Sequence, residues 1–205
     1  MRVSSWKTAG EAGWQNLIVQ PLTPDRWDDF ETLFGPSGAC YGCWCTYFRV
    51  PTSQRKTMDA AAKKQLIRER ISAGPPPGLL GYNDGQPIAW VQVGPRAELP
   101  QWNSPKTVSR PLDPADAEDS SVWAVSCFFM NSKDRGKGHS HRMLSEAVNF
   151  ARASGARLLE GCPIERTKQS KSVGLYVGSQ RIFEAAGFLE VAKRKDGRPL
   201  MRLVL

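Results

Sequence analysis

Two different spacings of apolar residues follow one another in the middle of the chain. Val122 to Met130 is a continuous apolar, β-branched and aromatic run, which is typical of a buried strand. After a short polar stretch, one apolar face recurs every three or four residues and consists of Met143, Leu144, Ala147, Val148 and Ala151. Gly155 stands where a C-cap glycine belongs. The segment therefore predicts a strand, a loop and a helix in that order.

The spacing predicts two earlier helices. Leu17 to Val19 is a short strand pattern, and Thr23-Pro24-Asp25 is typical of a helix start. The first helix has an apolar face of Trp27, Phe30, Leu33 and Phe34 and ends at Gly35-Pro36. A second helix is predicted between Thr57 and Ala73, and its inward residues are Met58, Ala62, Leu66 or Ile67, and Ile71.

Two further stretches complete the pattern. Residues 95–120 contain five prolines followed by three acidic residues, which predicts a long functional or mobile loop. Arg157 to Cys162 predicts one more strand after the central helix. No internal repeat and no domain boundary is visible, so we expect a loose tail over residues 1–16 and one domain over 17–205.

The loop between the central strand and helix has the composition of an anion site. Its residues are Arg135, Gly136, Lys137, Gly138, His139 and Ser140. The first N–H groups of a helix have no intrahelical partner, and glycines let a phosphate approach the backbone closely. Short glycine motifs also occur in turns that bind nothing. Phosphate binding and a plain strand-to-helix turn are therefore both open on these residues alone.

Composition narrows the classes of function. A chain of 205 residues with 40% hydrophobic and 23% charged residues is ordinary for a soluble globular protein. No apolar run is long enough to span a membrane, and the N-terminus lacks the apolar core of a secretory signal, so we expect a cytoplasmic protein. The net charge of +8 is spread without a dense basic stripe. It therefore gives little support to direct nucleic-acid binding.

The strand-loop-helix unit resembles the acyl-CoA pyrophosphate loop of the GNAT superfamily of N-acyltransferases. The pattern Arg-x-x-Gly-x-(Gly/Ala) is matched by Arg135 and Gly138, with Ser140 departing from it at the last position. Leu79 to Gly94 looks like the family's central hairpin, turning at Asp84-Gly85. The C-terminal stretch looks like its closing helix, its Gly187-Phe188 corner and a final hairpin at Asp196-Gly197. The resemblance covers roughly residues 17 to 205.

The resemblance implies a fold and a cofactor. We expect an α/β (α+β) domain whose central mixed, mostly antiparallel twisted sheet of about six to seven strands is flanked by about four helices. Acetyl-CoA is the expected cosubstrate, with no metal, and family members are often homodimers. Main-chain groups of Phe128, Phe129 and Met130 are implied to hold its pantetheine arm.

The same resemblance raises a question about the catalytic acid. Many members use a Tyr shortly before the Gly-Phe corner to protonate the leaving thiolate, but this chain has Phe183 there. Tyr176 is the nearest substitute, and a phenol suits a thiolate leaving group, although the residue is equally suited to packing. For the general base, Glu160 is the first candidate and Glu165 the second. Surface or salt-bridged roles compete with both, and members of the family also work without a dedicated base.

Cys40 to Arg49 lies between the first two predicted helices, where family members bind the acceptor. Some uncharacterised bacterial members carry a similar Cys-Trp-Cys segment. Trp44, Tyr47 and Phe48 are candidates to line the acceptor pocket, and Arg49 to grip an anionic group. These aromatics are equally suited to packing the loop onto the sheet.

The cysteines leave two further readings open. Cys40, Cys43 and Cys45 raise the alternative of a metal-binding or redox-sensing protein, but a structural zinc site requires four ligands.

Taken with the resemblance, the sequence predicts an N-acetyltransferase that moves an acetyl group from acetyl-CoA to a primary amine by direct attack in a ternary complex. A non-catalytic acyl-CoA-binding regulator is the main alternative. The acceptor is not identified by the sequence.

Overall fold

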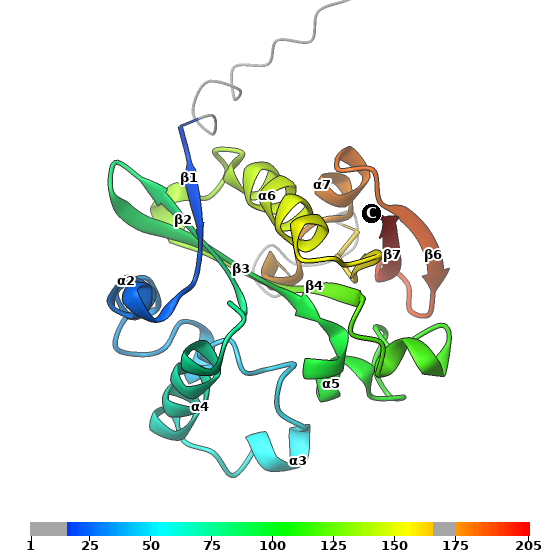
Figure 1. Ribbon diagram of the computed structural model, residues 1–205, viewed down its shortest axis with the longest axis horizontal. Helices are drawn as coiled ribbons and strands as arrows, with labels where there is room; N and C mark the ends of the chain where they lie inside the picture. Colours follow the sequence, from blue (N-terminus) through cyan, green and yellow to red (C-terminus); the bar gives the residue numbers. More distant parts are fainter. Residues whose placement is uncertain (1–15, 166–174) are drawn as a thin grey trace, which may run out of the picture.

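One seven-stranded sheet organises the computed structural model, which describes residues 16–165 and 175–205 (Figure 1). The spatial order is β1-β2-β3-β4-β5-β7-β6. The strands are β1 Ile18–Pro21, β2 Gly78–Asn83, β3 Gln86–Pro95, β4 Val122–Met130, β5 Leu158–Gly161, β6 Leu189–Lys193 and β7 Pro199–Val204. All neighbours are antiparallel except the parallel pair β4 and β5. The predicted mixed, mostly antiparallel sheet is confirmed.

The predicted hairpins are present with their turns. Asn83 and Gln86 are opposite each other at the end of β2 and β3. Between them, Asp84 and Gly85 have φ of 49° and 74°. Two consecutive positive φ values define the type I′ turn that matches the twist of antiparallel strands. The last hairpin joins β6 to β7 with Gly197 at a φ of 68°.

Helices cover both faces of the sheet. The four longer helices of the described residues are α2 Trp27–Phe34, α4 Ala60–Ala73, α6 His139–Ala153 and α7 Gln180–Ala185; α3 Thr52–Arg55 and α5 Pro100–Asn103 are single turns. Side chains of β3 alternate between two cores: Val91 and Val93 pack with α6 and α7, whereas Trp90 packs with α2 and α4. Because β3 is buried on both faces, it forms the centre of the fold.

Two helix starts differ from the sequence prediction. The helix predicted from Thr57 begins at Ala60, because the Asp59 carboxylate accepts a hydrogen bond from the Ala62 N–H at 2.7 Å and caps it there. Ala62 is consequently exposed and not part of the core. Thr23 precedes a short 3₁₀ turn without capping it; its hydroxyl instead accepts from Arg26 at 2.7 Å.

Residues 95–120 are more ordered than their proline content suggests. They contain α5 and two 3₁₀ turns, at Arg96–Glu98 and Pro114–Ala117. Trp102 is fully buried and packs with Leu99 and Cys162 in a small core of its own. The predicted long loop therefore contains short helical turns and folds against the sheet.

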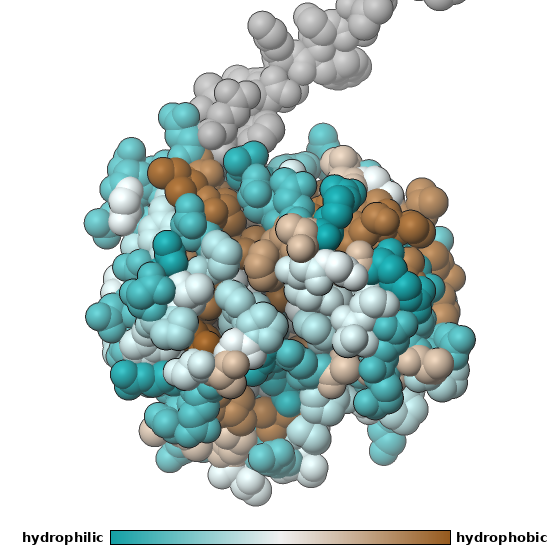
Figure 2. Space-filling model, in the orientation of Figure 1, coloured by the Kyte–Doolittle hydropathy of each residue, from teal (hydrophilic) through white to brown (hydrophobic). Residues whose placement is uncertain are grey.

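The surface is largely hydrophilic in the view of Figure 2, with apolar side chains gathered near β6. Leu189 and Val204 are the most exposed of these, at 73% and 74%. Across residues 16–165 and 175–205, no helix has the length and apolar character needed to cross a membrane.

Candidate functional site

Strand β4 changes its surroundings halfway along its length. Its first four residues, Val122 to Val125, pair with β5 on one side, and Trp123 to Val125 pair with β3 on the other. Strand β5 ends at Gly161, and Pro163 follows two residues later. From Cys127 to Met130, β4 therefore has a strand partner only on the β3 side within the described residues. Main-chain groups on the other side remain available to an extended ligand.

A cleft of about 420 Å³ opens along this unpaired edge. Three parts of the chain line it: the end of β4, the loop that leads into α6, and the approach to α7. The lining residues are Phe128, Phe129, Met130, Arg135, Gly136, Gly138, Ser140, His141, Tyr176, Gly178, Ser179, Arg181 and Ile182. All the predicted cofactor residues except Lys137 and His139 are among them.

The loop before α6 has the backbone of an anion cradle. Gly136 and Gly138 adopt φ of 80° and 85°, in the left-handed region that favours glycine. Gly138 is the N-cap of α6, and its carbonyl accepts from the His141 N–H at 3.0 Å. The N–H groups of the first turn have no intrahelical acceptor, and the helix dipole adds positive potential there.

Side-chain charge reinforces this potential. Arg135 and Arg181 both line the cleft, and the Arg135 Nε donates to the Met130 carbonyl at 3.1 Å, which ties the loop to the strand end. Burial and the nearby Arg181 lower the pKa of His141, so it is neutral near pH 7. No Asp or Glu is found among the described lining residues.

Lys137 and His139 do not line the cleft. The Lys137 ammonium pairs with Asp134 at 3.0 Å. His139 is buried, and burial lowers its pKa. Both residues therefore contribute to the structure of the loop and not to the lining of the cleft.

Phe183 belongs to the buried core, whereas Tyr176 lines the cleft. Phe183 is fully buried, with its ring edge-on to Phe128 and Phe188 at centroid distances of 6.2 and 5.0 Å. It packs beneath the cleft and carries no polar group into it. Tyr176 lies in the cleft wall, and a hydrogen bond with the Cys40 thiol is the main cause that raises its pKa to about 12. The phenol is therefore protonated at neutral pH.

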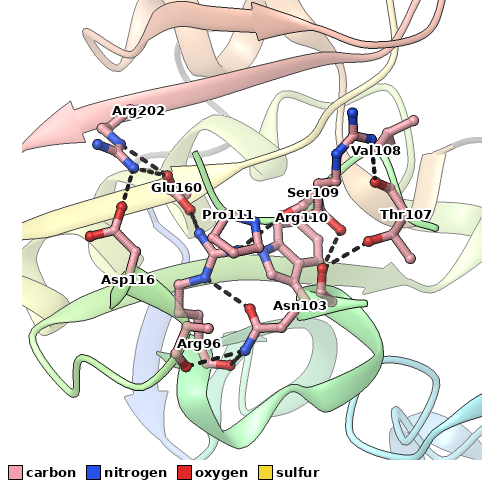
Figure 3. A network of polar contacts seen from close by, with 12 residues as sticks. Arg96, Asn103, Thr107, Val108, Ser109, Arg110, Pro111, Asp116, Glu160 and Arg202 are labelled. Atoms are coloured by element: carbon pink, nitrogen blue, oxygen red, sulfur yellow. Dashed lines mark hydrogen bonds and ion pairs between the residues drawn. The ribbon is translucent and has the colours of Figure 1, made fainter. Parts of the chain in front are cut away.

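The structure corrects the assignment of Glu160 as a base. Its side chain is fully buried and is held in an ion pair with Arg96, which is itself fully buried (Figure 3). Arg202 donates to the other carboxylate oxygen at 2.9 and 2.6 Å. Both carboxylate oxygens of Glu160 are thus engaged by guanidinium groups, and Glu160 does not line the cleft.

The ion pair belongs to a network that fastens residues 95–120 to the sheet. Arg96 also donates to Asn103 at 2.9 Å and to the Ser109 carbonyl at 3.0 Å (Figure 3). Arg202 also pairs with Asp116 at 2.8 Å. Glu165, the second candidate base, forms a partly exposed pair with Lys193 at 3.1 Å and does not line the cleft either.

The segment from Cys40 to Arg49 lies against the α2 side of the sheet. Trp44 is buried and stacks on Phe34 at 5.8 Å, while the Trp90 indole N–H donates to the Cys45 sulfur at 3.0 Å. The backbone is unusual, because Ala39, Tyr41, Trp44 and Cys45 all adopt positive φ. Such strain is stable only where surrounding contacts enforce it.

Arg49 is engaged inside the protein. Its side chain is 5% exposed and pairs with Glu98 at 2.9 Å, and Glu98 also binds Arg70. Tyr47 is half exposed, and the Arg55 guanidinium lies 3.9 Å from its ring centroid. Among the acceptor candidates, Tyr47 keeps an exposed surface, whereas Trp44 and Arg49 have contacts that position the segment.

Sequence reasoning missed Arg181 and the backbone around Gly178 and Ser179. The chain offered one signal, a Ser-Gln-Arg stretch at the start of the closing helix, which contains Arg181. Proximity of the two helix starts is visible only in three dimensions.

The fold matches solved structures, although no family model and no curated protein matches the sequence. An N-acetyltransferase from Staphylococcus aureus Mu50 aligns with a TM-score of 0.53 and 12% identity, covering 92% of this chain and 98% of the other. A ribosomal-protein-alanine N-acetyltransferase from Brucella melitensis aligns at 0.52 and 16%, covering 92% and 99%. PaiA N-acetyltransferase from Thermoplasma acidophilum, solved with coenzyme A, aligns at 0.50 and 10%, covering 92% and 99%. The chain has the GNAT fold.

Proposed function

We propose that this protein is an N-acetyltransferase that transfers the acetyl group of acetyl-CoA to a primary amine by direct attack in a ternary complex. The observation that carries the proposal is the cleft at the open edge of β4, which ends at the glycine loop and the N-terminus of α6. Structural neighbours named as N-acetyltransferases support it.

The residues of the cleft fit the parts of acyl-CoA. The main chain of Phe128 to Met130 has no strand partner on its open side and suits an amide-bearing pantetheine arm, and the loop at Gly136 and Gly138 suits a pyrophosphate. A Cβ built on Gly136 meets nothing within 4 Å, so the loop faces open space, and its φ of 80° disfavours other residues. When bound, acyl-CoA supplies an activated thioester. The chain then has to hold it beside the acceptor amine.

Tyr176 is the proposed acid. Its phenol lies in the cleft wall and is protonated at neutral pH, so it has a proton to give to a leaving thiolate. Phe183 fills the position where many family members have this Tyr. The role is therefore assigned to a residue seven positions earlier in the chain.

No described carboxylate lines the cleft to act as a base. The proposed route for the proton of the amine is water in the cleft, and amines that are already neutral at the working pH react without further help. Positioning of the amine against the thioester then provides most of the rate enhancement. We assign the acceptor side to the Cys40–Arg49 segment, with Tyr47 in contact with the acceptor and Trp44 and Arg49 setting the shape of the segment.

Thermal unfolding with and without acetyl-CoA tests cofactor binding, with ATP as the control ligand. A ligand present at 100 times its dissociation constant stabilises by about 2.7 kcal/mol. We expect a shift with acetyl-CoA and CoA but not with ATP. Gly138→Glu should abolish the shift. Gly155→Glu is the matched control, because Gly155 has a similar φ of 81° at the other end of the same helix. Loss of the shift in both variants, or in neither, contradicts the proposal.

A non-catalytic acyl-CoA-binding regulator is the second candidate, favoured by the apolar Phe183 and by the lack of a described carboxylate in the cleft. A panel of amines, with released CoA thiol measured, separates the two functions. Turnover with any amine favours the enzyme, whereas a thermal shift without turnover across the panel favours the regulator.

The proposed quaternary state is a homodimer. Leu189 and Val191 are exposed at 73% and 39% on β6, which is an edge strand of the sheet. Such an edge is suited to pairing with a second copy. Light scattering of the wild type and of Leu189→Lys tests this, and a monomeric wild type contradicts it.

A further inference from the structure

A buried side-chain amide joins two parts of the candidate site that are far apart in the chain. Gln92 in β3 is 1% exposed, and its Nε2 donates to the Cys45 carbonyl at 3.2 Å. Its Oε1 accepts from the hydroxyl of Ser126, which is fully buried, at 2.9 Å. Since a carbonyl can only accept, the NH₂ group has to face Cys45 and the amide oxygen has to face Ser126. The proposed acetyl transfer gives none of these groups a role.

Ser126 lies at the point where β4 passes from its closed half to its open half. Val125 is the last residue of β4 that pairs with β5. The neighbours of Ser126 on either side are opposite Gln92 and Val93, so Ser126 itself has no opposite residue in β3. An extra residue of this kind is a β-bulge, which bends the strand. The hydrogen bond to Gln92 therefore fixes the strand at its bend.

The other end of the amide holds the acceptor segment. Trp90 and Gln92 are two positions apart in β3 and therefore project to the same face of the sheet. The Trp90 indole N–H donates to the Cys45 sulfur at 3.0 Å, and Gln92 donates to the Cys45 carbonyl. Trp44 and Cys45 have φ of 45° and 57°, a strained conformation that needs such contacts to persist. Tyr47, the proposed contact with the acceptor, follows two residues later.

The bend in β4 is close to where the chemistry is expected. The proposed cofactor site runs from the glycine loop, which follows Met130, back along the open edge to Phe128. The phosphates belong at the loop, so the thioester belongs toward the start of the open half, where Ser126 lies two residues before Phe128. The Gln92 amide therefore joins the strand that holds the thioester to the segment that holds the amine.

We propose that Gln92 is a positioning residue for acetyl transfer, an inference that rests on the proposed function. Its amide fixes the acceptor segment relative to the bend in β4, and so fixes the approach of the amine to the thioester. Gln92 is not among the described residues that line the cleft, so it acts through Cys45 and Ser126. Reaction rates are sensitive to such positioning, since a displacement of about 1 Å can lower a rate by roughly 100-fold.

The test replaces the amide and separates catalysis from cofactor binding. Gln92→Met keeps an unbranched side chain of similar length but removes both hydrogen bonds. With the fastest-reacting amine of the panel, we expect kcat, measured as released CoA thiol, to fall by roughly 10- to 100-fold. The dissociation constant for acetyl-CoA, measured by calorimetry, should stay within about twofold, because other residues line the cleft.

Ser126→Ala is the second variant, and thermal unfolding shows whether each variant is folded. It removes one of the two hydrogen bonds and should lower kcat by less than Gln92→Met does. The double variant should have a kcat within about twofold of that of Gln92→Met, since both changes break the same chain of bonds. If Gln92→Met does not fold, the kcat of Ser126→Ala decides the question.

Ser109→Ala is the matched control. The Ser109 hydroxyl is also buried and also donates at 2.9 Å, but to the Trp102 carbonyl within residues 95–120. Its loss should leave kcat unchanged. The inference is overturned if the folded Gln92 and Ser126 variants keep the wild-type kcat, if Ser109→Ala lowers kcat equally, or if acetyl-CoA binding weakens as much as kcat falls. A wild type that turns over no amine overturns the proposed function, and this inference with it.

Discussion

The two halves of strand β4 show how one strand serves two purposes. In the first half, β5 closes the sheet, and Glu160 lies in a buried ion-pair network with Arg96 and Arg202. In the second half, the strand edge is open and faces a cleft lined by Tyr176. A polar residue beside the closed half forms ion pairs within the fold, whereas one beside the open half remains available for a ligand. The position of a candidate relative to the end of β5 is therefore more informative than its residue type.

The largest effect on stability should come from removing the Glu160 carboxylate from the ion-pair network beside the closed half of β4. Glu160→Gln leaves the buried Arg96 guanidinium without its counter-ion, and such changes cost about 3–5 kcal/mol of folding free energy. Urea unfolding measures the loss. Glu165→Gln is the control, because its partly exposed pair with Lys193 should change stability by less than about 1 kcal/mol. A Glu160→Gln protein that is as stable as the wild type but inactive would restore Glu160 as a base.

Removing the Tyr176 hydroxyl beside the open half of β4 should lower kcat and leave the free energy of unfolding nearly unchanged. Tyr176→Phe deletes the proposed acid, and the loss of general acid catalysis should lower kcat by roughly 10²- to 10⁴-fold. The dissociation constant for acetyl-CoA, measured by calorimetry, should remain within about twofold of the wild type, since the ring stays in the cleft wall. An unchanged kcat would remove Tyr176 from the mechanism.

A smaller effect is expected from Arg181, which also lines the cleft. Arg181→Ala removes one exposed positive charge near the phosphate loop and should weaken acetyl-CoA binding by roughly tenfold at low salt and less at high salt. Arg152→Ala, at the opposite end of α6, serves as the matched control for net charge. Equal effects of the two variants would mean that only the overall charge matters.

The pH dependence should show the smallest change of all. A phenol acid works while it is protonated, so a pKa of about 12 extends the working range upward. We expect kcat to rise with pH as the amine acceptor loses its proton, with no fall over roughly pH 6 to 10. A descending limb near pH 8 to 9, where thiols ordinarily titrate, would point to a cysteine in place of Tyr176.

Local patterns predicted the secondary structure around the glycine loop well. The change from strand to helix spacing around Arg135 is contained within one short stretch, and the turn at Asp84-Gly85 follows from two adjacent residues. Tyr176 was expected as the substitute acid on position alone, and it does lie in the cleft wall. Its role there remains a prediction.

Long-range contacts were not predictable in this way. Glu160 pairs with Arg96, 64 residues away, and with Arg202, 42 residues away, so its strand pattern gave no sign of its partners. Arg49 likewise meets Glu98, 49 residues along the chain. Glu160 was a candidate because its strand neighbours are apolar, and Arg49 because it follows the aromatic segment that the resemblance places at the acceptor pocket. In the fold, the side chains of Glu160 and Arg49 are both buried, and both form ion pairs there.

Amide hydrogen exchange along β4, with and without acetyl-CoA, tests the central claim most directly. The amides of Val122 to Val125 lie in the closed half and should already be protected, so the ligand should change them little. The amides of Phe128 to Met130 that face the open edge should become protected when acetyl-CoA binds, and ATP should not protect them. Protection that appears elsewhere in the chain, with Phe128 to Met130 unchanged while acetyl-CoA still stabilises the protein, would contradict the account.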